Sequence, residues 1–236
     1  MEIAKGIEII ETALWLKKQN ILIINDLHIG YEEVLQRKGI LVPKFQLKEI
    51  ITKLEHILEK TKPEKVIING DLKHEFGTVL KQEWKEVLQF LDVVLQKCKT
   101  VIIIKGNHDP IIAPIAEKRR VAVVTEYSVD DTLIVHGDEL METKATRIII
   151  GHEHPAITMR EGSKWEKYKC FLKGKWQRKE LIAVPSFNPL LEGTDILKEE
   201  VLSPFLEDIA TFKVYIVNKG EVFDFGKVKD LQKRIK

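Results

Sequence analysis

The chain has few cysteines and almost no net charge, and each of these properties argues against a class of protein. The only two cysteines, Cys98 and Cys170, lie far apart in the sequence. This excludes a site built from paired thiolates and a disulfide-dense secreted framework. The chain has 38 basic and 36 acidic residues, a net charge of +2. Any binding to nucleic acid would therefore need a local patch of positive charge.

Long apolar runs are missing as well. No run approaches the roughly 20 residues that a membrane span requires. The amino terminus, Met1 to Gly6, also lacks a basic segment followed by a continuous apolar stretch. We therefore expect a cytoplasmic protein with no membrane partner. The 236 residues are 44% hydrophobic, which suits one domain over residues 1–236, closed by a hairpin and a basic tail within residues 205–236.

Short apolar runs are present, and five of them end abruptly in residues that can bind metal or transfer protons. With their polar ends, they occupy residues 21–28, 66–71, 103–109, 133–137 and 148–154. Apolar residues recur at spacings of three and four over 47–58 and 79–95, which predicts two amphipathic helices between the first three runs. Alternating strands and helices predict parallel crossovers, whose ligands bind outside the carboxyl ends of the strands. Residues 1–25 read as two or three short strands, and strands dominate again after residue 120.

Six of the seven histidines stand at or just after these strand ends, together with three aspartates and an asparagine. These residues are His28, His74, His108, His136, His152, His154, Asp26, Asp71, Asp109 and Asn107. Oxygen and imidazole donors without thiolate suit Mn²⁺, Fe or Zn²⁺, and there are more donors than one ion can use. Asp26 and His28 are two residues apart, so their side chains would share one face of an extended backbone. The sequence therefore predicts a site for two divalent ions.

The ordered blocks resemble those of the calcineurin-like metallophosphoesterases. They read Asp26-x-His28, Gly70-Asp71, Gly106-Asn107-His108-Asp109, His136-Gly137 and Gly151-His152-x-His154. The resemblance implies an α/β fold, a four-layer αββα sandwich of two mixed sheets flanked by helices, with a dinuclear metal site at the strand carboxyl ends. Manganese is the expected metal, with Fe, Zn²⁺ or Ni²⁺ as alternatives.

The same resemblance divides the ligands between two ions that share one carboxylate. It assigns the first ion to Asp26, His28, Asp71 and His154. It assigns the second ion to Asp71, Asn107, His136 and His152. A hydroxide between two such ions can attack a phosphate at neutral pH.

Three further residues are expected to act on the substrate or on its neighbours. The resemblance implies that His108 faces the substrate while Asp109 orients its ring, although a merely supporting His108 remains an alternative. His74 is the last residue of the motif Gly70-Asp71-x-x-His74, which is similar to that of the nuclease branch that processes DNA breaks. It is either a second substrate-facing histidine or a surface histidine at a helix entrance. Lys73 departs from that branch, where an apolar or aromatic residue is common.

The function that these features predict is metal-dependent hydrolysis of phosphodiester bonds in nucleic acid or nucleotides. Two segments, residues 26–32 and 184–189, look most like those of small single-domain archaeal and bacterial phosphoesterases associated with DNA helicases or ligases. That likeness implies a DNA-repair context and a helicase partner. The alternatives are a phosphomonoesterase, including a protein phosphatase, and a non-catalytic scaffold. The sequence leaves the natural substrate, the natural metal and the oligomeric state open.

One local feature bears on nucleic acid binding. Residues 160–180 contain eight basic and three acidic side chains, with four aromatic residues among them. Such a mixture can follow a phosphate backbone and stack on bases. The same alternation is also typical of a half-exposed strand whose lysines form a solvated edge.

Overall fold

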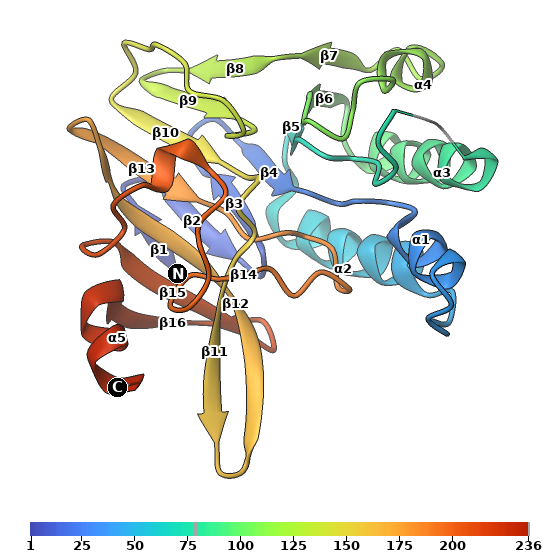
Figure 1. Ribbon diagram of the computed structural model, residues 1–236. Coiled ribbons are helices and arrows are strands. Elements are labelled where there is room, and N and C mark those ends of the chain that lie inside the picture. The colour runs from blue at the N-terminus through green and yellow to red at the C-terminus, as the bar shows by residue number, and fades with distance from the viewer. Residues whose placement is uncertain (78–79, 236) are drawn as a thin grey trace.

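The computed structural model of the protein describes residues 1–77 and 80–235. Seven strands form the first of two sheets (Figure 1). In spatial order they are β1 (Glu2–Ala4), β2 (Ile7–Ile10), β3 (Ala13–Leu16), β4 (Ile21–Asn25), β5 (Lys65–Asn69), β6 (Thr100–Ile104) and β7 (Ala122–Val124). Strands β1 to β4 pair antiparallel, and β4 to β7 pair parallel. The parallel crossovers are confirmed, whereas residues 1–25 hold four strands rather than two or three, because turns at Gly6 and Glu11 reverse the chain early.

The second sheet is also mixed. Its strands, in spatial order, are β14 (Thr194–Asp195), β11 (Pro155–Glu161), β12 (Lys164–Trp176), β13 (Lys179–Ala183), β10 (Arg147–Ile150), β9 (Thr132–Val135) and β8 (Glu126–Val129). The hairpin of β15 (Lys213–Asn218) and β16 (Glu221–Lys227) joins through β12. Within this sheet β13, β10 and β9 are parallel. Their carboxyl ends therefore lie along one edge.

Helices cover the outer faces of both sheets, and Figure 1 shows most of them on one side of the molecule. On the first sheet lie α1 (Tyr31–Arg37), α2 (Gln46–Thr61), α3 (Lys81–Lys97) and α4 (Ala113–Glu117). The second sheet carries α5 (Val228–Ile235) and the short 3-10 helix η1 (Pro204–Leu206). The chain thus has the αββα arrangement of two mixed sheets.

Alternation along the central strands explains why they are apolar on both faces. In β4, Ile24 packs against the helices while Ile23 packs against the other sheet. Ile68 and Ile67 of β5 divide in the same way. Successive strand residues point to opposite faces, so a strand in an inner layer needs apolar side chains throughout.

The two long amphipathic helices begin and end close to the expected positions. In α2 the buried stripe includes Ile50, Leu54 and Ile57, and the helix ends at Thr61, before Pro63. In α3 the stripe includes Val87 and Val94, and the first helical residue is Lys81. The start expected at Val79 lies outside the described residues. Each fully buried aliphatic side chain contributes about 1.5–3 kcal/mol to holding the helix on the sheet.

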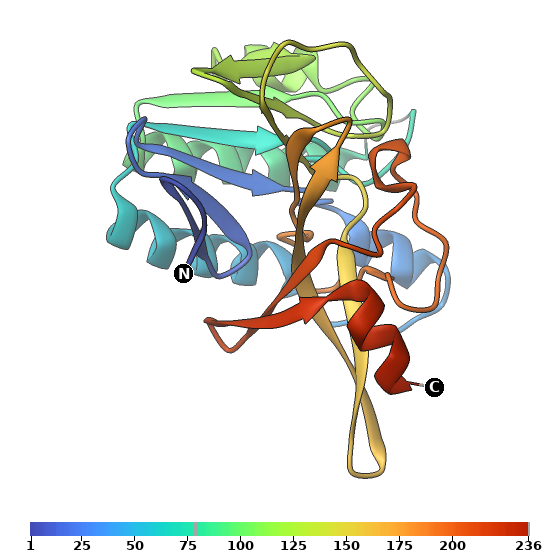
Figure 2. The ribbon, with the colours of Figure 1, turned by 90° about the vertical axis from the view of Figure 1, so that its left-hand side faces the viewer.

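Two peripheral features complete the fold. The β11–β12 hairpin projects well beyond the rest of the chain, as both views show (Figures 1 and 2). The basic tail forms the helix α5 as far as Ile235. Among the helices of the described residues, none is long and apolar enough to span a membrane.

Candidate metal centre

The polar residues that follow five strands meet where the two sheets come together. Asp26 and His28 follow β4, Asp71 follows β5, Asn107 follows β6, His136 follows β9, and His152 and His154 follow β10. Residues that span more than 120 positions of the chain are thereby brought into one cluster. The parallel pairing of β4, β5 and β6, and of β9 with β10, places these ends side by side.

Three groups of donors are compact enough to hold a metal ion, and two of them consist of expected ligands, whereas the third joins His28 to His74 and His108. In the first group, donor atoms of Asp26, His28 and His154 lie within 4.8 Å of one another. The Nε2 atoms of His28 and His154 are 3.4 Å apart, and His154 Nε2 lies 3.6 Å from Asp26 Oδ1. Asp71 Oδ2 lies 3.6 Å from His28 Nε2, so Asp71 adjoins this group.

The second group consists of Asp71, His136 and His152, whose donor atoms also lie within 4.8 Å of one another. His136 Nε2 is 3.5 Å from Asp71 Oδ2, 3.2 Å from His152 Nδ1 and 2.9 Å from Asn107 Oδ1. Asp71 Oδ2 therefore lies between the two groups. All seven side chains that the sequence proposes as ligands are brought together, while their division between two ions stays a prediction.

Burial makes this donor set suited to cations. Asp26 is fully buried and Asp71 is 2% exposed, and two carboxylates held in a protein interior require nearby positive charge. His136 supplies some of it: burial alone would lower its pKa, but its hydrogen bond to Asp71 and the charge of Asp26 raise the pKa to about 9. Burial and the neighbouring His154 instead hold the pKa of His28 well below its ordinary value. A neutral imidazole is the form that binds metal.

The backbone at the centre is bent rather than extended. Asp26, His28 and Asp71 have φ values of 51°, 44° and 44°, and His152 and His154 have 62° and 48°. The expectation that Asp26 and His28 share a face because the backbone stays extended is therefore wrong. Left-handed turns bring the side chains together instead. Such conformations cost about 1–3 kcal/mol each and persist where the surroundings enforce them.

Glycine is required where ligand side chains lie directly against the main chain. A Cβ atom on Gly70, whose φ is +80°, would lie 1.8 Å from His136 Nδ1. A Cβ atom on Gly106 would lie 2.2 Å from Asp71 Oδ1. The glycine before each motif thus leaves the space that the donor side chains occupy, as the sequence suggests for Gly70.

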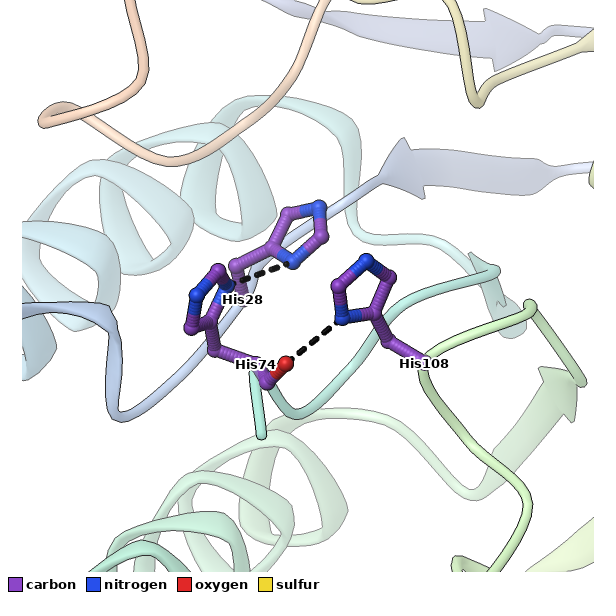
Figure 3. Close-up of side chains that lie close together, drawn as sticks. All are labelled: His28, His74 and His108. Carbon is purple, nitrogen blue, oxygen red and sulfur yellow. Dashed lines mark hydrogen bonds between the residues drawn. The ribbon is translucent and has the colours of Figure 1, made fainter. Parts of the chain in front are cut away.

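Two further histidines lie beside the first group (Figure 3). His74 Nδ1 is 3.2 Å from His28 Nδ1, and His108 Nδ1 is 2.6 Å from the carbonyl oxygen of His74. The rings of His74 and His108 stack, with centroids 5.4 Å apart. If His28 offers Nε2 to an ion, its Nδ1 carries the proton and donates to His74. Burial and the neighbouring His108 lower the pKa of His74 to about 4, which keeps it neutral as an acceptor.

Asp109 does not make the contact expected of it. Its carboxylate is fully buried and accepts the backbone N–H groups of Leu72, Lys73 and Gly106, at 3.1, 3.3 and 3.3 Å. The partner of His108 Nδ1 is the carbonyl of His74. The direct orientation of the His108 ring by Asp109 is therefore wrong. The carboxylate of Asp109 holds the loop that begins at Asp71, and a residue of that loop, His74, contacts the His108 ring.

The segment after β13 contributes residues that had no predicted role. Ser186 Oγ donates to the carbonyl of Asp26 at 2.7 Å. Asn188 Nδ2 donates to the carbonyl of Leu27 at 2.8 Å. Lys169 Nζ, which lies inside the protein, donates to the carbonyls of Ser186 and Asn188. Ser and Asn between two prolines were the available signal, but nothing in the sequence shows that they face a loop 160 residues earlier.

The basic stretch of residues 160–180 forms most of the β11–β12 hairpin. Lys167 Nζ donates to the carbonyl of Gly193 at 3.0 Å, and Lys173 Nζ donates to the carbonyl of Ile3 at 2.6 Å. With Lys169, and with Arg160, whose Nε donates to the carbonyl of Gly162 at 2.9 Å, four of the eight basic side chains are therefore tied to the protein itself. This favours the half-exposed strand over a continuous track for a phosphate backbone.

Two facing sheets with buried carboxylate, amide and imidazole donors at their joined strand ends define a metal-binding α/β sandwich. The chain belongs to the calcineurin-like phosphoesterase family, whose model matches residues 19–217. The match contains every donor described above. The protein is accordingly a metal-dependent phosphoesterase.

The solved structures that resemble the chain include the following three. Nuclease MPE from Pseudomonas putida has 19% identity and a TM-score of 0.67, over 91% of this chain and 92% of that one. The phosphoesterase Yfce from E. coli has 12% identity and a TM-score of 0.42, over 88% of this chain and 98% of that one. The protein of unknown function AQ665 from Aquifex aeolicus has 19% identity and a TM-score of 0.38, over 57% and 78%. The first of these supports the fold. No curated protein sequence matches the chain.

Proposed function

We propose that the protein hydrolyses phosphodiester bonds in nucleic acid or nucleotides. The observation that carries this proposal is the pair of stacked histidines, His74 and His108, beside the first donor group. A monoester dianion calls for a cationic clamp, for which arginine is the usual choice. Within residues 1–77 and 80–235, the hydrogen bonds of the arginine side chains go to groups that lie outside both donor groups. Histidines, rather than arginines, beside the ions suit a diester, which carries less charge than a monoester.

The proposed ligands are those expected from the sequence, with Asp71 shared between two ions. Bound Mn²⁺, or alternatively Fe, Zn²⁺ or Ni²⁺, would supply a hydroxide nucleophile at neutral pH and neutralise charge on the phosphate. His108 holds its Nδ1 proton against the carbonyl of His74. Its Nε2 is then the atom that carries a proton to the leaving oxygen. Asp109 fixes the loop that presents the His74 carbonyl, and so acts as a positioning residue.

The decisive experiment compares esters under one metal regime. Protein stripped with chelator is reloaded with Mn²⁺ and assayed on bis-p-nitrophenyl phosphate and p-nitrophenyl phosphate, and then on single-stranded and duplex DNA. We expect turnover to require Mn²⁺ and to favour the diester. Preference for the monoester would replace the substrate class with phosphomonoesters. Purified protein that holds no metal and gains no activity with Mn²⁺ would instead favour the scaffold.

The structure of Pseudomonas putida nuclease MPE supports the fold on which this proposal rests. A nucleic-acid repair context, a helicase partner, a cytoplasmic location and a single domain over residues 1–236 stay predictions of the sequence. Co-purification with a tagged copy of the chain from its native cells tests the partner. Limited proteolysis tests the domain, because one domain resists cleavage between residues 26 and 217.

A further inference from the structure

An exposed aromatic residue lies at the edge of the centre and has no part in the functions described so far. Phe76 is 61% exposed, although it belongs to the loop that begins at Asp71. Its ring meets that of His108 with centroids 5.7 Å apart and an interplanar angle of 88°. An edge contact of this kind occupies at most one face of the phenyl ring. The rest of the Phe76 ring is open to solvent, next to His108, the histidine proposed to protonate the leaving oxygen.

Buried contacts hold the residues that lead to Phe76. Glu83 of α3 is fully buried, and its Oε1 accepts the backbone N–H groups of His74 and Glu75 at 3.0 and 2.8 Å. Lys73, also fully buried, donates to the carbonyl of Glu75. The residue at which the chain departs from the nuclease branch therefore points inward and anchors the loop. The residues that precede Phe76 are therefore held in place by buried hydrogen bonds.

The position of Phe76 restricts which part of a substrate can contact its ring. If a phosphate held at the two donor groups has its leaving oxygen beside His108, as the proposed function requires, the substituent on that oxygen extends past His108 toward Phe76. The open face of an aromatic ring matches another flat ring. Stacking of a nucleobase on an aromatic side chain contributes about 1–3 kcal/mol and tolerates any base.

We propose that Phe76 is a stacking surface for the nucleobase next to the scissile phosphate, so that the substrate is a nucleotide diester read without preference for base identity. This inference rests on the proposed phosphodiesterase function and names its substrate class. Phe76 then determines specificity through the base, while His108 acts on the ester.

The test compares two diesters that differ only in the base. One is a thymidine dinucleotide, and the other carries an abasic tetrahydrofuran in place of the nucleoside on the leaving side. With the Mn²⁺-loaded protein we expect kcat/KM to be about 5- to 150-fold higher for the dinucleotide, the equivalent of about 1–3 kcal/mol. In Phe76→Ala this ratio falls toward one, mainly through KM. Phe76→Trp keeps the ratio, and Phe76→Leu falls between the two.

A matched control is Phe223→Ala, which removes an exposed phenylalanine from β16, and which should keep the wild-type ratio. If the wild-type protein hydrolyses neither diester, the proposed function fails and not the stacking alone. If it hydrolyses both but Phe76→Ala leaves the ratio unchanged, or lowers kcat equally for both, the stacking role is wrong. Binding of a non-hydrolysable 2-aminopurine dinucleotide gives an independent readout, since fluorescence quenching should weaken in Phe76→Ala and survive in Phe76→Trp.

Discussion

The side chain of Asn188 offers a sharp test of how the first donor group is held. Asn188 is fully buried, and its Nδ2 lies 2.8 Å from the carbonyl of Leu27 and 3.4 Å from that of His28. The His28 carbonyl also accepts from Gln46 Nε2 at 2.7 Å. Replacing Asn188 with alanine therefore leaves the buried Leu27 carbonyl without its donor, and it also removes the acceptor of the half-buried Leu190 N–H, which lies 2.8 Å from Asn188 Oδ1.

The expected magnitude follows from that count. One buried carbonyl without a partner costs about 1–3 kcal/mol of unfolding free energy. Leu27 lies between Asp26 and His28, both of which have left-handed backbone conformations. Loosening this turn displaces two expected ligands at once. Loss of a comparable supporting contact lowers metal affinity by about 10- to 100-fold, the equivalent of about 1.4–2.7 kcal/mol.

Two measurements separate these effects. Urea unfolding with chelator present gives the stability of the metal-free protein, and calorimetric titration with Mn²⁺ gives the affinity. Asn218→Ala, which removes an exposed asparagine at the end of β15, is the matched control and should change neither quantity. If Asn188→Ala loses stability but binds Mn²⁺ as tightly as the wild type, Asn188 supports the fold alone and the reasoning about the ligand turn is refuted.

Three further changes test other parts of the centre. His108→Ala should lower kcat for diesters by about 10²- to 10⁴-fold at unchanged metal content, and full turnover with metal bound would reject its acid role. Gly70→Ala should abolish binding of the second ion in a titration, because its Cβ would lie 1.8 Å from His136 Nδ1, and wild-type binding would contradict that clash. Burial lowers the pKa of Lys53 to about 8 from 10.5, so the folded state binds fewer protons than the unfolded state between these values and unfolding free energy should rise with pH across that window. Lys53→Met should flatten this rise, and an equal slope in both proteins would refute the assignment.

The apolar runs predicted the order of strands and helices because burial dictates both. A strand such as β5, apolar on both faces, is interpretable only as part of an inner layer, and its abrupt polar end marks the carboxyl edge of the sheet. The same logic located the donor residues, since the edge of a parallel sheet collects strand ends. The left-handed φ angles at Asp26 and His28 could not be predicted in this way. Nothing in the identity of Asp or His specifies them, and they are enforced by contacts from residues 186–188.

Asp109 shows a second limit of sequence reasoning. Its place next to His108 suggested a contact between the two side chains, yet neighbours in a turn point in different directions. The carboxylate instead satisfies backbone N–H groups of the loop after β5, a partner set visible only in three dimensions. Burial and the charge of Asp71 raise the pKa of Asp109 to about 6. The hydrogen bonds from the loop oppose this rise, because they stabilise the charged carboxylate in a place that water does not reach.

The contacts around the first donor group imply that the site is organised before metal arrives. The Asp26 carbonyl is held by Ser186 and the Leu27 carbonyl by Asn188, and neither bond involves a donor atom of the site. Without metal, the raised pKa of His136 lets it carry a proton between the carboxylates of Asp26 and Asp71. A bound ion would take the place of that proton while the backbone stays where it is, so little ordering entropy would oppose its binding. Contacts within the fold maintain the left-handed turn at Asp26 and His28, so metal binding does not have to supply the free energy that forms this turn.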